Sequence, residues 1–104
     1  MMFDILITNG TVLDGTGAES FHADIGITGQ KIEAIGDLSG SIAKQIIDAT
    51  SLTVSPGFID THVHCDGALL MDPQHASSLR QGVTTEILGQ DGLSYAPLSA
   101  ENYN

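Results

Sequence analysis

Pro56-Gly57-Phe58-Ile59-Asp60-Thr61-His62-Val63-His64 is a mostly apolar run that ends in two histidines, two positions apart. Residues two apart on a β-strand point to the same face of the sheet. We therefore expect a strand over 57–63, from whose end His62 and His64 project side by side. Because two neutral imidazoles on one rigid edge make half of a metal site, the pattern predicts metal ligation. The alternative is a pair of histidines with a structural role only.

The residues after this strand favour a helix and then a second strand. Asp72-Pro73 fits a helix N-cap followed by proline at the first helical position, and Gly82 suits the position just after the helix end. We expect the helix over 74–81. The β-branched and apolar run 83–88 then predicts a strand. Strands connected in this order lie parallel and are joined by a right-handed crossover.

A two-stranded parallel sheet cannot stand alone, because its faces need covering helices. Residues 56–104 are therefore predicted to open a (β/α)8 TIM-like barrel that is incomplete here, since a whole barrel takes about 250 residues. We expect the chain to be an N-terminal fragment of a longer protein. A complete small α+β domain is the alternative.

Residues 1–55 show a different sequence pattern, in which short apolar runs are separated by glycine-containing turns. Alternating and β-branched runs predict strands at 3–7, 23–27, 31–35, 45–47 and 52–54. Asn9-Gly10 is a strong two-residue hairpin signal, so the chain is expected to turn there and return over 11–13. The regular short spacing predicts an N-terminal β-sandwich segment or a barrel-like module. The whole chain is then a mixed α/β protein, with a boundary between its two parts at residues 55 and 56.

The composition is that of a folded, acidic protein. The 104 residues carry a formal net charge of −10 and 41% of them are hydrophobic, which argues against disorder. Three basic residues are too few to neutralise a phosphate backbone, so we expect no nucleic-acid partner. No apolar run approaches the roughly 20 residues that cross a bilayer, and no signal peptide is evident. With a single cysteine besides, we expect a cytoplasmic protein without a membrane partner.

Three aspartates could complete or support a site at the histidine pair. Asp91 follows the second predicted strand, and parallel neighbours lie about 4.8 Å apart, so its carboxylate could reach the same metal. Gly89 and Gly92 beside it permit a tight loop, and a turn-forming role for Asp91 is equally consistent. Asp60 could orient an imidazole or bond to a nearby backbone group. Asp66 could meet the metal or a substrate, although a turn-capping role is favoured.

Cys65 and the two remaining histidines are expected to lie outside the site. By strand parity Cys65 faces away from His62 and His64, which predicts a buried apolar filler. His22 and His75 are expected to be solvated or structurally bonded.

The histidine-bearing stretch resembles the signature that opens the catalytic barrel of the amidohydrolase superfamily. DILITNGTVLDGTG, ADIGITGQKIEAIG and IIDATSLTVSPGFID, which precede or lead into it, are similar to the N-terminal β-sandwich segment of that superfamily. LRQGVTTEILGQDGLSYAPLS, at 79–99, resembles the N-acyl-D-amino-acid deacylase (D-aminoacylase) branch. The resemblance covers essentially the whole chain.

This resemblance implies a hydrolase that uses zinc or another divalent metal to remove the acyl group from N-acyl-D-amino acids. It implies that His62 and His64 are metal-site residues on the first barrel strand. In many members of the branch a zinc-binding cysteine stands at the position of Asp91, and a second acidic residue often stands at that of Cys65. The aspartate base and two further histidine ligands are implied beyond residue 104, so this piece is expected to be inactive alone.

Two alternatives stay open at this point. One is a dihydroorotase- or hydantoinase-like cyclic amidohydrolase of the same superfamily. The other is a non-catalytic module on the same scaffold.

Overall fold

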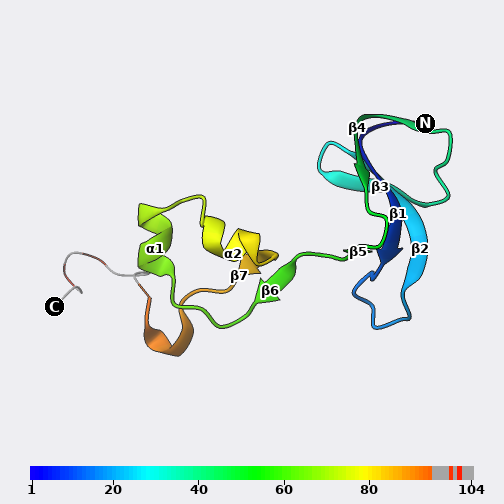
Figure 1. The fold of residues 1–104 in the computed structure, drawn as a ribbon. Coiled ribbons are helices and arrows are strands. Elements are labelled where there is room, and N and C mark those ends of the chain that lie inside the picture. Colours follow the sequence, from blue (N-terminus) through cyan, green and yellow to red (C-terminus); the bar gives the residue numbers. More distant parts are fainter. Residues whose placement is uncertain (95–98, 100, 102–104) are drawn as a thin grey trace. The chain divides into compact units, whose positions relative to one another are not determined.

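The computed structural model describes residues 1–94, 99 and 101, and the chain divides into two compact units, 1–56 and 57–104 (Figure 1). The first unit holds strands only, and the second holds strands with short helices. The described chain is thus a mixed α/β fold in which strands predominate.

The first unit is a single five-stranded sheet. Its strands are β1 (Met2–Val12), β2 (Phe21–Thr28), β3 (Lys31–Gly36), β4 (Ile42–Asp48) and β5 (Thr53–Val54). The strand order is β3-β2-β1-β4, and β5 pairs with the C-terminal end of β1, at Thr11 and Val12. β1 runs antiparallel to β2 and parallel to β4 and β5. Each predicted run falls in a strand, but 3–7 and 11–13, which were expected to be two strands, belong to the single strand β1, and the other strands differ from the prediction at their ends.

The core of the first unit gathers around β1, which has neighbours on both sides. Phe3 and Leu6 of β1 are almost fully buried, and Leu6 pairs with Gly26 of β2. The Phe3 ring lies against Gly26 of β2, within 2.8 Å of the place where a Cβ would stand. Position 26 must therefore be glycine, because any side chain there would overlap the Phe3 ring.

The hairpin expected at Asn9-Gly10 is wrong, because β1 runs straight through both residues. The pairing of β1 with β2 shifts register between Ile7 and Gly10, which is a β-bulge. Asn9 takes a φ of 61°, so its tolerance of the left-handed conformation serves the bulge rather than a turn. Its backbone N–H donates to Asp24 at 2.9 Å and its side-chain amide donates to Asp48 at 3.0 Å. These hydrogen bonds to residues distant in the sequence favour a β-bulge at Asn9 over a hairpin turn.

The second unit is built on β6 (Phe58–Asp60) and β7 (Val83–Glu86), which pair in parallel. The connection between them carries α1 (Asp66–Met71) and α2 (Ala76–Arg80), and a 3-10 turn, η1 (Gln90–Gly92), follows β7. The expected β–loop–α–β order with parallel strands is confirmed. Both strands are shorter than predicted.

The single helix expected over 74–81 is only half right. α2 occupies its second part, but Asp72 closes the preceding helix α1, which the sequence did not predict. The residue before α2 is His75, in the left-handed conformation with a φ of 43°. Gly82 does follow α2 with a φ of 84°, as expected for the position after a helix end. Proline at 73 therefore follows a helix instead of opening one.

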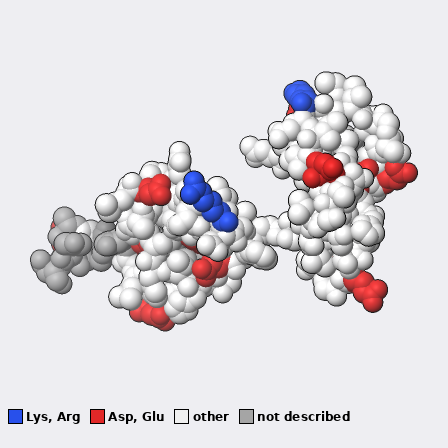
Figure 2. Space-filling view, viewed as in Figure 1, with Lys and Arg blue, Asp and Glu red and all other residues white. Residues whose placement is uncertain are grey.

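The surface agrees with the acidic composition. Figure 2 shows acidic side chains scattered over both units on the face in view. Lys44 pairs with Asp4 at 2.6 Å within the first unit. Among the described residues, no helix is both long and apolar enough to cross a membrane.

Candidate metal centre

The two histidines of the opening stretch lie in the loop that follows β6. The strand ends at Asp60, so the prediction that His62 and His64 sit on a strand to residue 63 is wrong. Their rings nevertheless lie side by side, with centroids 5.2 Å apart and planes at 78°. The loop, rather than strand parity, brings the imidazoles together.

Asp91 lies in η1, the tight turn after β7. Its own φ is 57°, and Gly89 and Gly92 beside it also have positive φ, of 78° and 73°. Aspartate tolerates this conformation better than most residues, and such backbone conformations concentrate at functional sites. The two glycines act as expected, because they let the chain reverse and carry Asp91 back toward the loop after β6.

The three side chains converge on one carboxylate oxygen. Oδ2 of Asp91 lies 2.9 Å from Nε2 of His62 and 3.5 Å from Nε2 of His64. All three side chains are 40% exposed or more, and an exposed ion pair of this kind stabilises a fold very little. Folding stability therefore does not account for the cluster.

The donor set and its spacing fit a divalent metal. Imidazole nitrogen and carboxylate oxygen are ligands of zinc, with bonds of about 2.0–2.2 Å, so ligand atoms around a tetrahedral ion lie about 3.4 Å apart. The three ligand atoms here lie within 4.8 Å of one another. An ion could enter with only small shifts of the side chains.

Asp60 and Asp66 support this loop in different ways. Asp60 accepts a hydrogen bond from the backbone N–H of His62 at 3.1 Å, so of its two expected roles the backbone one is observed. Asp66 begins α1 and accepts a bond of 3.4 Å from the Ser94 hydroxyl. Asp66 and His64 line a cavity of about 450 Å³ beside the cluster. That volume lies in the range of small-molecule sites.

A second polar cluster, which the sequence analysis missed, joins Cys65, His75 and Glu86. The Cys65 thiol donates to Oε2 of Glu86 at 2.9 Å, and Nδ1 of His75 lies 3.1 Å from the same oxygen. Cys65 is buried, as expected, but it is a hydrogen-bond donor and not merely an apolar filler. His75 is structurally bonded, as expected. An acidic residue within the apolar run 83–88 was the signal available in the sequence.

The charge of Glu86 dominates the electrostatics of this second cluster. Its hydrogen bond with Cys65, aided by burial, raises the pKa of the Cys65 thiol to about 11. Hydrogen bonds from Cys65 and then Ser78 hold the pKa of the Glu86 carboxyl below its usual range. The thiol is therefore protonated and the carboxylate ionised at neutral pH.

With this geometry in place, comparison with known proteins defines the class. A model of the amidohydrolase family matches residues 45–104, a range that contains both histidines and Asp91. The match covers more than half of the chain, and the chain belongs to the amidohydrolase family.

Within this family, the chain is similar to D-aminoacylases. The chain is 44% identical over 100 residues to the D-aminoacylase of Alcaligenes xylosoxydans xylosoxydans, an alignment that covers 96% of this chain and 21% of the relative. A crystal structure of D-aminoacylase matches with a TM-score of 0.89 and 46% identity, over 98% of this chain and 22% of that one.

A further solved structure holds a metal. The N-acyl-D-glutamate deacylase of Bordetella bronchiseptica, complexed with zinc and a phosphonate mimic of the tetrahedral intermediate, matches with a TM-score of 0.91 and 38% identity. The alignment covers all of this chain and 22% of that one. The chain thus spans about a fifth of the length of the relatives it matches.

Proposed function

We propose that the protein containing this chain is a zinc-dependent amide hydrolase that removes the acyl group from N-acyl-D-amino acids. The observation that carries the proposal is the convergence of His62, His64 and Asp91 on one point. The similarity to D-aminoacylase and to a zinc-bound deacylase supports both the metal and the substrate class.

In this proposal His62 and His64 bind the metal through Nε2, and Asp91 binds it through Oδ2. Asp91 supplies the one negative charge among these ligands, so a dication keeps a net positive charge at the site. When bound, zinc polarises a carbonyl and activates water. The hydrogen bond from His62 N–H to Asp60 fixes the loop backbone and thereby the direction of the first imidazole.

We also propose that residues 1–55 form one part of a β-sandwich and that residues 56–104 open the catalytic barrel. The exposed apolar side chains Phe58 and Ile59 of β6 support this assignment, because a buried barrel strand is apolar on both faces. The rest of the metal ligands and the general base would then come from later barrel strands. The 104-residue chain alone would be inactive.

The metal assignment is tested in the intact protein with the variants His62→Ala and His64→Ala. Loss of a residue that only hydrogen-bonds to a metal ligand lowers metal affinity or activity about 10–100-fold, so loss of a ligand itself should cost at least about 100-fold in kcat/KM together with most of the bound zinc. His22→Ala is the matched control, since His22 lies in the first unit and contacts Thr11. Unchanged zinc content and turnover in both ligand variants would refute the site.

The substrate class is tested with a panel of N-acyl-D-amino acids, their L-enantiomers and cyclic amides. We expect turnover of the D-series, with much lower rates for the other two groups. Ring opening without deacylation would instead identify a hydantoinase-like enzyme.

A further inference from the structure

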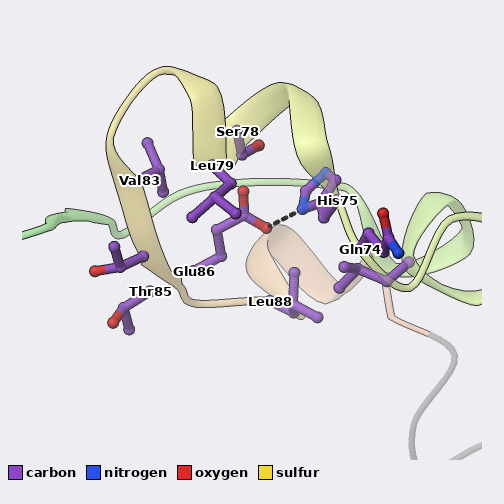
Figure 3. Close-up of a pocket in the computed structure, with 10 residues that line it drawn as sticks. Gln74, His75, Ser78, Leu79, Val83, Thr85, Glu86 and Leu88 are labelled. Carbon is purple, nitrogen blue, oxygen red and sulfur yellow. Dashed lines mark ion pairs between the residues drawn. The ribbon is translucent and has the colours of Figure 1, made fainter. Parts of the chain in front are cut away.

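The Cys65, His75 and Glu86 cluster brings three metal-ligand side chains together from three separate segments. Cys65 precedes α1, His75 precedes α2 and Glu86 ends β7. Figure 3 shows the Glu86 carboxylate reaching from β7 toward the His75 ring. We propose that this cluster is a second metal site, for a thiophilic divalent ion such as zinc, cobalt or cadmium. The proposal does not rest on the function proposed above.

The spacing of the donors supports a site for one ion. Sγ of Cys65, Nδ1 of His75 and one oxygen of Glu86 lie within 4.8 Å of one another. Zinc bonds of about 2.3 Å to sulfur and about 2.0–2.2 Å to nitrogen and oxygen place such ligands roughly 3.5 Å apart. The contacts of 2.9 and 3.1 Å to Glu86 would therefore lengthen by about half an ångström on binding.

The chemistry of the cluster also favours a cation. The ion would replace the proton that Cys65 shares with Glu86, and that proton would leave to solvent. His75 would bind through its Nδ1 lone pair with its own proton on Nε2. Thiolate and carboxylate together would neutralise the two positive charges of the ion, which matters because His75 and Glu86 are only 19% and 12% exposed.

Two of the three donor residues border a cavity. His75 and Glu86 line a cavity of about 340 Å³, which Figure 3 shows beside β7 and α2. The cavity leaves room for a water molecule or a small ligand as the fourth donor. The cluster thus has three protein ligands and an open position, and this donor set differs from the first site by its sulfur.

The test uses cobalt, because a thiolate bound to Co²⁺ gives a charge-transfer band in the near ultraviolet and imidazole or carboxylate does not. The intact protein, freed of metal, is titrated with Co²⁺. We expect a thiolate band in the unmodified protein, its loss in Cys65→Ser, and its retention in His62→Ala, which removes only a ligand of the first site.

The absence of a thiolate band from the unmodified protein at saturating cobalt would overturn the proposal, as would an unchanged band in Cys65→Ser. If that variant does not fold, His75→Asn decides, because it leaves the thiol in place. We expect it to weaken cobalt binding at the thiolate site at least tenfold, and an unchanged affinity would identify the cluster as a hydrogen-bonded cross-link only.

Discussion

Nε2 of His62 lies 2.9 Å from Oδ2 of Asp91, although 29 positions separate the two residues along the chain. The contact arises because β6 and β7 are parallel neighbours. The loops that leave them start from the same edge of the sheet, which is where α/β folds place their ligands. A metal bound here would hold both loops together.

Replacement of Asp91 tests what its side chain contributes. Asp91→Asn removes the negative charge and should lower zinc affinity of the intact protein at least tenfold. Asp91→Cys restores an anionic ligand, so it should retain metal and shift the preference toward softer ions such as cadmium. Metal content after dialysis against zinc, cadmium or both measures the two effects. Equal zinc affinity in Asp91→Asn would show that the carboxylate is not a ligand.

Phe3 should be the largest single contributor to the first unit. Its side chain is 1% exposed, and loss of a buried phenylalanine costs about 3–5 kcal/mol, so Phe3→Ala should lower the free energy of unfolding by about that amount. Ile42→Ala on β4 is the control, since Ile42 is 63% exposed and should cost far less. Urea unfolding followed by signals from residues 1–56 measures both. Similar losses in the two variants would contradict the assigned core.

Gly57 should tolerate no side chain because β7 passes too close. A Cβ at this position would overlap the side chain of Thr84. We expect Gly57→Ala to destabilise the second unit by about 1–3 kcal/mol, the usual cost of overpacking. The double variant Gly57→Ala with Thr84→Ala should recover part of this loss, whereas simple additivity would show that the two residues do not meet.

Asp48 should make the first unit sensitive to acid. Hydrogen bonds from Thr50 and then from Asn9 hold the pKa of the Asp48 carboxyl below its usual range. Because the folded-state pKa is lowered, its stabilising effect is present above the unfolded value and disappears as pH falls through the folded value. Asp48→Asn should therefore reduce the loss of stability that occurs as the pH falls below about 4, the usual pKa of an aspartate in an unfolded chain. A matching acid profile in both proteins would refute this role.

Local sequence signals predicted much of the fold, but not all of it. The alternating runs marked the strands of the first unit, and the order of elements after residue 56 predicted parallel pairing, because both depend on local periodicity. The hairpin prediction at Asn9 failed because a β-bulge and a hairpin turn both require a residue with positive φ. The helix start predicted at Asp72 was wrong because an aspartate followed by proline can also end a helix.

The sequence by itself determined which residues have metal-binding chemistry and that His62 and His64 lie near a strand end, since residue type and spacing are local properties. Only the tertiary structure decided that the pair sits in a loop, that Asp91 meets it, and that Glu86 joins Cys65 to His75. Those contacts depend on the parallel alignment of β6 with β7, and a pairing between segments more than 20 residues apart leaves no periodic trace in either segment.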